Sequence, residues 1–113
     1  MTASTPTLEV AILNVRAGTG AEFEAAFRKA SAIISAMPGY HSHELRRCVE
    51  ISSRYILLVH WRSLEDHTIG FRQSSEYQRW RGLLHHFYDP FPTVEHYGPS
   101  LVTHADVATR SPV

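Results

Sequence analysis

The chain has 113 residues, of which 43% are hydrophobic and 19% are charged, a balance typical of a single soluble globular domain. Lys and Arg together number 11 and Asp and Glu together number 11, so the formal net charge is zero and no basic field favours nucleic acid as a partner. No apolar run approaches the roughly 20 residues that cross a bilayer. The N-terminus lacks a secretory signal and the single cysteine, Cys48, cannot form an internal disulfide, so a cytoplasmic protein without membrane contact is expected.

Composition divides the chain into three sections. Residues 1–7 are small and polar and are expected to form a disordered lead-in. Residues 8–97 are expected to form the folded domain. Residues 98–113 are expected to form an extended C-terminal arm or a disordered tail.

The first part of the domain is predicted to be a strand followed by a helix. Leu8–Val15 is apolar on both faces, with Leu8, Val10 and Ile12 on one and Ala11, Leu13 and Val15 on the other. After a break at 17–20, one apolar stripe with helical spacing predicts a helix, which ends at Pro38-Gly39. The stripe consists of Phe23, Ala26, Phe27, Ala30, Ile33, Ile34 and Met37.

Two strands are predicted next. Tyr40–Val49 is expected to alternate between its two faces, with His41, His43, Leu45 and Arg47 on one and Tyr40, Ser42, Glu44 and Arg46 on the other. Arg54–Arg62 is the strongest strand candidate and is apolar on both faces.

The second helical region is predicted to be split in two. Ser63 with Asp66 resembles a capping box, so a short helix is expected to begin there and to end at Gly70. Ser74 or Ser75 is expected to cap a longer helix that reaches about Phe87. Its apolar face is Tyr77, Trp80, Leu83, Leu84 and Phe87, and the short last strand is expected at Thr93–Tyr97.

The resulting order, β-α-β-β-α-β, predicts an α+β fold of the ferredoxin-like type, with helices on one face of a four-stranded antiparallel sheet. A sheet with one face in water normally alternates apolar and polar residues. Because the first and third strands are apolar on both faces, the second face needs a cover, and a second copy of the chain would supply it. A homodimer with the sheets packed face to face is therefore expected.

Several segments together resemble one family, the antibiotic biosynthesis monooxygenase-type dimeric α+β barrels. They are LEVAILNVRAG, MPGYHSHEL, VHW before SLEDH, GFRQS and VEHY, and the resemblance covers about Leu8–Tyr97. The family includes cofactor-free oxygenases of aromatic polyketides, quinone-forming oxygenases and haem-degrading enzymes. Resemblance of fold does not choose among these activities.

The resemblance singles out a tryptophan and a histidine at the junction of the third strand and the short helix. Trp61 matches a strand-end tryptophan of the polyketide oxygenases, where it would line a pocket and donate its indole N–H to a substrate oxygen; the alternative is a core residue. His67 matches a histidine frequent in the family and could act as a catalytic base. In the polyketide oxygenases, the matching position resembles a tyrosine instead. The alternative for His67 is a structural or surface histidine.

Two arginines are candidates for stabilising an anion. Arg81 matches an arginine of the polyketide oxygenases, and Arg72 competes with it; either could instead be a solvated side chain that covers apolar surface. Leu57 departs from the family, because the polyketide oxygenases carry an asparagine there. The expected pocket residues are Trp61, Leu57, Phe71, Tyr77, Trp80 and His96.

No metal or other cofactor is expected. His41 and His43 make a half-site at most, and neither His85-His86 nor His96 completes a ligand set. The Asn/Trp/His set of the haem-degrading branch falls at about Ala11, Phe71 and Arg81, none of which matches.

The leading functional hypothesis is a cofactor-independent monooxygenase that oxidises a small aromatic or polyketide-type phenol with O2. In it, His67 removes the phenol proton and Arg81 or Arg72 steadies the anion. The alternative is a non-catalytic dimeric barrel that binds a small apolar ligand or a partner protein, which Leu57 favours. Haem binding is a third, weaker hypothesis.

Overall fold

The computed structural model describes residues 5–105 of the chain. Within them the elements follow the predicted order. They are β1 (Thr7–Asn14), α1 (Gly20–Ile34), β2 (Tyr40–Arg47), β3 (Arg54–Trp61), the π-helix η1 (Asp66–Phe71), α2 (Ser75–Leu84), the 3-10 turn η2 (His85–Phe87) and β4 (Val94–Tyr97). Thr7, expected in the lead-in, is the first residue of β1, and residues 1–4 lie outside the described part.

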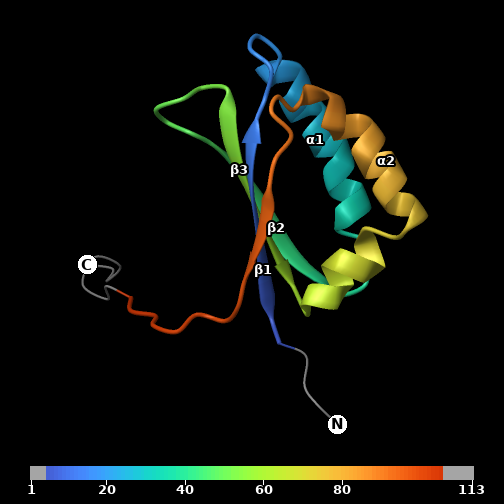
Figure 1. Cartoon of the computed structure of the whole chain (residues 1–113), viewed down its shortest axis with the longest axis vertical. Coiled ribbons are helices and arrows are strands. Elements are labelled where there is room, and N and C mark those ends of the chain that lie inside the picture. The colour runs from blue at the N-terminus through green and yellow to red at the C-terminus, as the bar shows by residue number, and fades with distance from the viewer. Residues whose placement is uncertain (1–4, 106–113) are drawn as a thin grey trace, which may run out of the picture.

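The four strands form one antiparallel sheet in the order β2-β3-β1-β4. Both α1 and α2 lie against the same face of this sheet (Figure 1). This arrangement confirms the predicted ferredoxin-like α+β fold. No helix within residues 5–105 is long and apolar enough to cross a membrane.

The core fills the space between the sheet and the two helices. The predicted stripe of α1 faces inward, with Phe23, Phe27, Ala30 and Ile34 buried and Ala26, Ile33 and Met37 packed at its edge. Full burial of each large apolar side chain contributes about 1.5–3 kcal/mol. The sheet contributes the inward-facing side of β1 and β3, namely Ala11, Leu13, Tyr55, Leu57, Val59 and Trp61.

Ser74 caps α2. Its side-chain oxygen accepts a hydrogen bond of 3.1 Å from the backbone N–H of Tyr77, which decides between the two predicted caps. Trp80 and Leu84 of this helix are buried, as their spacing predicts. The regular helix ends at Leu84, and the last residues to Phe87 tighten into the 3-10 turn.

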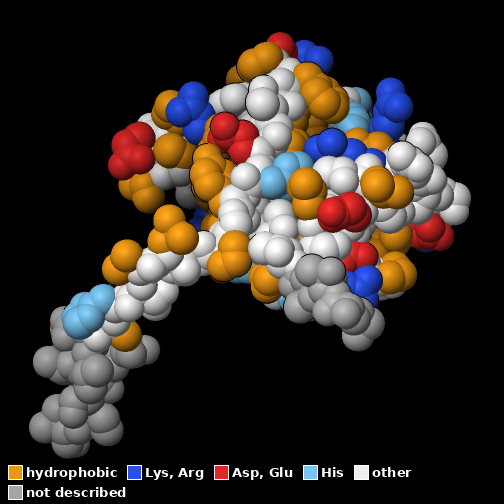
Figure 2. All heavy atoms as spheres, turned by 60° about the horizontal axis from the view of Figure 1, so that its bottom comes forward, with side chains coloured by type: hydrophobic (Ala, Val, Ile, Leu, Met, Phe, Trp, Pro, Cys, Tyr) orange, Lys and Arg blue, Asp and Glu red, His pale blue; other side chains and the backbone are white. Residues whose placement is uncertain are grey.

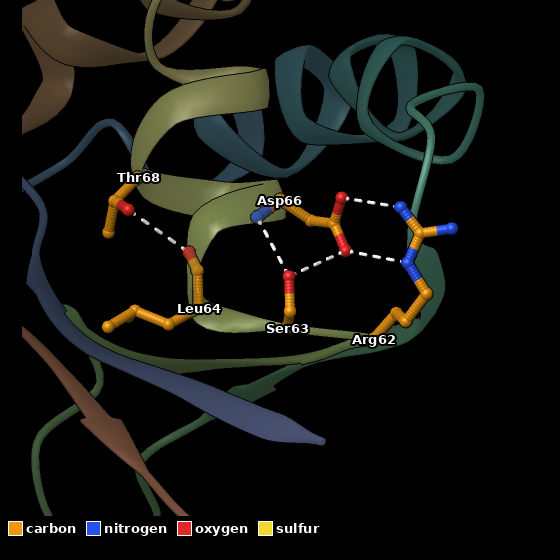
Figure 3. A network of polar contacts seen from close by, with 5 residues as sticks. All are labelled: Arg62, Ser63, Leu64, Asp66 and Thr68. Atoms are coloured by element: carbon orange, nitrogen blue, oxygen red, sulfur yellow. Dashed lines mark hydrogen bonds and ion pairs between the residues drawn. The ribbon is translucent and has the colours of Figure 1, made fainter. Parts of the chain in front are cut away.

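The start of the short helix is fixed by a network around Asp66 (Figure 3). The Ser63 hydroxyl accepts from the Asp66 backbone N–H at 3.2 Å and donates to the Asp66 carboxylate at 2.9 Å, so the predicted cap forms. Arg62 donates two further hydrogen bonds to the same carboxylate, at 2.9 and 2.8 Å. Together these contacts hold the end of β3 against the start of η1.

Gly70 does not end this helix, contrary to the prediction. The Arg72 backbone N–H donates to the carbonyl of His67, five residues back, so the chain widens into a π-helix that continues through Phe71. In this wider turn both His67 and Phe71 are buried. The π-helix therefore sets which side chains of the segment point into the protein.

Gly39 allows β2 to begin close to the same network. Its φ of +82° lies in the region that favours glycine, and a Cβ built on it would lie 2.3 Å from the Asp66 side chain. Its carbonyl also accepts a 2.7 Å hydrogen bond from the Arg62 N–H. A side chain at this position would displace Asp66.

The predicted alternation of β2 is wrong at its first residues. Tyr40 pairs with Trp61, whereas Ser42 pairs with the next residue of β3, His60, so a β-bulge takes up one residue. The bulge turns Tyr40 to the inward side, where its hydroxyl contacts Nδ1 of His43. His41 is exposed and His43 half-buried, so the two histidines do not form a pair.

The other face of the sheet has no covering element among residues 5–105 (Figure 1). This open face contains Leu8, Val10 and Ile12 of β1 and Ile56 and Leu58 of β3; Ile12 is 40% exposed. Beyond β4, residues 98–105 form an extended arm with hydrophobic side chains that runs clear of the folded body (Figure 2). Residues 106–113 of the predicted arm lie outside the described part.

Candidate active site

A cavity of about 490 Å³ lies between the sheet and the layer formed by η1 and α2. Aromatic rings make up most of its wall, and Ala11, Leu13, Leu57 and Val94 form its apolar floor on the sheet. This volume falls in the range of pockets that enclose small organic ligands. The aromatic wall consists of Phe71, Tyr77, Trp80, His85, Tyr88 and Phe91.

A second hollow, of about 710 Å³, lies between α1 and the edge strand β2. One of its two carboxylates, Glu24, accepts hydrogen bonds of 2.6 Å from both Arg47 and Tyr55. The arginine is largely exposed, so these contacts form a solvated surface network. The smaller of these two cavities is lined by the buried carboxyl group of Glu9 and the buried imidazole of His67.

Glu9 places a carboxyl group in the wall of the smaller cavity. The residue is 5% exposed, and its Oε1 accepts a hydrogen bond of 2.9 Å from the indole N–H of Trp61. Burial raises the pKa of Glu9 from 4.5 to about 7, against the opposing effects of the Trp61 hydrogen bond and the Arg72 charge. Near neutral pH this carboxyl group therefore exists in both protonated and ionised forms.

His67 lies between Glu9 and His96. Its Nε2 is 3.3 Å from Oε1 of Glu9, and its Nδ1 is 2.8 Å from Nε2 of His96. Burial, with the charges of Arg72 and His96, lowers the pKa of His67 from 6.5 to about 3. The imidazole is therefore neutral at pH 7, and its 3.3 Å approach to Glu9 is a contact between polar atoms rather than an ion pair.

Trp61 lies behind this group and is fully buried. Its ring stacks on the imidazole of His67 with centroids 5.3 Å apart and an angle of 21°. Its indole N–H is already used by Glu9, and the ring does not border the cavity. Trp61 thus orients Glu9 and His67 from the core side.

The two candidate arginines occupy different places. Arg72 borders the cavity, and its charge lowers the pKa values of Glu9, His67 and His96. Arg81 is exposed on α2 and lies outside the cavity wall. Burial, and after it the charge of Arg81, lowers the pKa of His85. The fold therefore brings Arg72, and not Arg81, to the buried carboxyl group.

Four of the predicted pocket residues line the cavity: Leu57, Phe71, Tyr77 and Trp80. Sequence reasoning missed Glu9, His85 and Tyr88. Glu9 had a signal in the sequence, because it is a charged residue on the strand face that otherwise contains Ala11, Leu13 and Val15. Tyr88 is buried, and burial, with the charges of Tyr77 and Glu9, raises the pKa of its hydroxyl, which therefore remains a hydrogen-bond donor.

Among residues 5–105, no cluster of three or more His, Cys, Asp or Glu side chains has the arrangement of a metal site. The geometry of the Glu9 group gives the reason. His67 faces Glu9 through one ring nitrogen and His96 through the other, so the three side chains form a line and share no central point.

Similar proteins were found by sequence and by structure. The chain is 58% identical over 89 residues to the uncharacterized protein YczJ of Bacillus subtilis, a match that covers 79% of this chain and 94% of YczJ. A Bordetella bronchiseptica protein, assigned to the antibiotic biosynthesis monooxygenases, is 33% identical with a TM-score of 0.82, covering 87% of this chain and all of that one.

SnoaB, a cofactor-independent oxygenase from Streptomyces nogalater, has the same fold. It aligns with a TM-score of 0.65 at 21% identity over 89% of this chain and 97% of SnoaB. The family described as antibiotic biosynthesis monooxygenase matches residues 7–83, which is more than half of the chain. The fold, the family match and the Bordetella relative together show that this chain belongs to the antibiotic biosynthesis monooxygenase family.

Proposed function

We propose that this protein is a cofactor-independent monooxygenase that oxidises a small aromatic or polyketide-type phenol with O2. The observation that carries the proposal is the cavity, which combines an aromatic wall with a buried carboxyl group of pKa about 7 and an arginine at its edge. Membership of the family and the shared fold with the oxygenase SnoaB support it.

The reaction needs no external reductant. Loss of the phenolic proton gives a phenolate, which transfers one electron to O2 and forms an aryloxyl radical and superoxide. The two radicals couple at a ring carbon to give a peroxide. Removal of the proton on that carbon, with cleavage of the O–O bond, releases water and leaves a quinone, so one phenol and one O2 give one quinone and one water.

The residues of the cavity match the needs of these steps. The guanidinium of Arg72 supplies positive charge for the phenolate and the peroxide anion. The rings of Phe71, Tyr77 and Trp80 hold a flat substrate and limit the access of water to the radicals. The carboxyl group of Glu9 and the neutral imidazole of His67 can each hold a proton between steps.

Oxygen uptake tests this proposal. The purified protein, treated with a chelator to remove adventitious metals, is mixed with dihydroxynaphthalene or anthrone compounds in an oxygen electrode, and quinone formation is followed by absorbance. The expected result is one O2 consumed per quinone formed. Saturable binding of these compounds with no O2 uptake above the protein-free rate would contradict it.

A non-catalytic binding barrel is the second candidate, and one observation favours it. Leu57 is 3% exposed and lies on the cavity floor, where an amide would hold a substrate oxygen in the family's polyketide oxygenases. A leucine there only packs against a ligand. Under this alternative, aromatic ligands raise the thermal unfolding temperature and are recovered unchanged after prolonged incubation in air.

We also propose that two copies of the chain pair through the open face of the sheet. The face contains five apolar side chains that no element within residues 5–105 covers: Leu8, Val10, Ile12, Ile56 and Leu58. Burying them against a second copy would remove this surface from water. Light scattering combined with size exclusion should give twice the monomer mass at micromolar concentration, and a monomer mass would reject the pairing.

A further inference from the structure

We infer that Glu9 accepts the acidic proton of the bound molecule and that His67 and His96 conduct this proton to solvent, so that the site exchanges such protons with water in the absence of oxygen. The inference rests on the proposed function only for the class of bound molecule, a phenol or the enolisable ketone that is its tautomer. The geometry of three side chains carries it.

The position of the Glu9 carboxyl leaves one oxygen available to a ligand. Oε1 is held by Trp61 and lies beside His67. Oε2 has no hydrogen-bond partner among the described residues, and no fully buried side-chain oxygen or nitrogen there lacks one, so Oε2 is open to the cavity that Glu9 borders. A proton on a ligand in the cavity therefore meets Oε2 first.

His67 is a poor direct base in this arrangement. Both of its ring nitrogens contact protein groups, Nε2 with Glu9 and Nδ1 with His96. A ligand would have to displace one of them to reach a lone pair. This differs from the role expected from the sequence, and it makes His67 a positioning residue that acts through Glu9.

The fold fixes the line of three groups. Glu9 and His96 are direct cross-strand partners on β1 and β4, and both face the helical layer. The π-helix brings His67 to both of them. His96 is half-buried on an edge strand, so the line runs from the cavity toward the edge of the sheet.

Proton transfer along this line is balanced at every step. Oε2 of protonated Glu9 takes the ligand's proton while Oε1 donates its own proton to Nε2 of His67; the proton on Nδ1 of His67 passes to Nε2 of His96, and the proton on Nδ1 of His96 leaves to water. While the ligand is ionised, the carboxyl and ring N–H protons exchange with water, so the reverse sequence returns a solvent proton to the ligand. Each imidazole exchanges one tautomer for the other, so neither stays charged.

The surrounding charges favour a path that stores no positive charge. Arg72 lowers the pKa values of both histidines, after burial as the larger cause, and thus disfavours a lasting imidazolium. The same arginine assists ionisation of Glu9. The proton consequently rests on the carboxyl group or leaves the site.

Deuterium exchange without oxygen tests the inference. Anthrone is incubated with the protein in deuterated buffer under argon, and incorporation at its acidic CH2 group is followed by NMR. The expected result is exchange faster than in protein-free buffer, and a loss of about 100-fold in Glu9→Gln, the scale typical of a removed general base. Glu22→Gln, which changes an exposed carboxylate on α1, is the matched control and should exchange like the wild type.

The histidine path is tested by chemical rescue. His96→Asn should slow exchange several-fold at low buffer concentration, and imidazole added to the solution should restore it. A purely structural role of His96 would not respond to imidazole. His41→Asn, which removes an exposed histidine of β2, should leave exchange unchanged.

Trp61→Phe keeps the test independent of whether Glu9→Gln folds. Loss of the indole hydrogen bond raises the pKa of Glu9, so the pH midpoint of the exchange rate should move upward. The inference would be overturned if Glu9→Gln exchanged deuterium at the rate of the wild type, or if Trp61→Phe left the pH midpoint of the exchange rate unchanged. Glu9-dependent exchange without O2 uptake in air would leave the inference standing and reject the oxygenase; O2 uptake that Glu9→Gln does not affect would do the opposite.

Discussion

The indole N–H of Trp61, at the end of β3, donates a 2.9 Å hydrogen bond to the carboxyl of Glu9 on β1, and both residues are buried. The two lie diagonally across neighbouring strands, since Trp61 pairs with Thr7 and Glu9 with Val59. A donor in this place partly offsets the cost of burying an acid. The tryptophan that the family resemblance assigned to the substrate thus donates its hydrogen bond to the acid in the cavity wall.

Removing this donor should weaken the fold and change the acid. Trp61→Phe keeps most of the ring volume but leaves Oε1 of Glu9 without its indole donor, which should cost about 1–3 kcal/mol of unfolding free energy. The ionised form loses more than the protonated form, so the carboxyl pKa of Glu9 should rise above its value of about 7. Urea unfolding measures the first effect and carboxyl-carbon NMR the second; a pKa equal to or below that of the wild type would contradict the account.

Stability should depend on pH through Glu9 in a defined direction. The folded pKa is about 7 and the ordinary value 4.5, so between these pH values the folded state holds a proton that the unfolded state has released. Unfolding free energy therefore falls as pH rises through this window, by roughly 3 kcal/mol. His67 acts oppositely, because its folded pKa of about 3 lies below 6.5 and its contribution rises with pH between those values.

The two contributions are separated by comparing variants. Subtracting the unfolding free energy of Glu9→Gln from that of the wild type cancels the groups that both proteins share, and this difference should fall between pH 4.5 and 7 and be level above it. The groups that face Glu9 are Trp61, His67, Arg72, His96 and Tyr88, and all stay in place in this variant. A difference that is constant with pH would show that Glu9 titrates normally.

Arg72 and Arg81 form a matched pair for anion binding. Arg72 borders the cavity and Arg81 does not. Arg72→Gln should weaken binding of a naphtholate about 5- to 10-fold, since an exposed charge contributes on the order of 1 kcal/mol, whereas Arg81→Gln should bind like the wild type. Titration by fluorescence at a pH where the ligand is ionised gives both dissociation constants, and equal losses in the two variants would count against the assigned position of Arg72.

The open face of the sheet should govern assembly. Val10 and Leu58 are cross-strand partners on this face, so Leu58→Glu would place a charge at its centre and, in the proposed pair of sheets, bring like charges into an apolar interface. The expected outcome is a monomer in light scattering. Ile69→Glu is the control, because Ile69 is 53% exposed on η1 and lies with the helical layer; it should keep the assembly of the wild type.

Two glycines should respond in opposite directions to alanine. Gly39→Ala puts a methyl group 2.3 Å from the Asp66 side chain at a φ of +82°, and should destabilise the protein by about 1–3 kcal/mol. Gly82 is inside α2 with nothing within 4 Å of a built Cβ, so Gly82→Ala should stabilise the helix by up to about 1 kcal/mol. Thermal unfolding of both variants measures the contrast, and a neutral Gly39→Ala would show that Asp66 moves freely.

The order of elements could be predicted because it depends on local patterns. The stripe of α1, the cap at Ser74 and the apolar strand β3 each follow from spacing within a short window. The bulge at His41 and the π-helix of η1 could not be predicted in this way, since each depends on contacts with other elements, Trp61 for the first and the sheet for the second.

The site shows a similar division. His67 and three rings of the aromatic wall, Phe71, Tyr77 and Trp80, were predicted from the segments that contain them, and Arg72 was one of two candidates, whereas His85, Tyr88 and Phe91 were not predicted. Glu9 was not predicted because the apolar residues around it define β1 as a strand, and a single acid among them does not by itself indicate a site. Its effect depends on Trp61 and His67, which are more than fifty residues away in the chain and come together only when the sheet forms.

The cavity is built from two parts of the fold that can vary separately. Its acid and that acid's indole donor lie on β1 and β3, and His96 on β4, where strand pairing fixes them. The rings of Tyr77, Trp80 and His85 come instead from α2 and the turn after it. Substitutions along this helical wall can therefore change the size and shape of the ligand that fits, while the buried acid and its partners on the sheet stay in place.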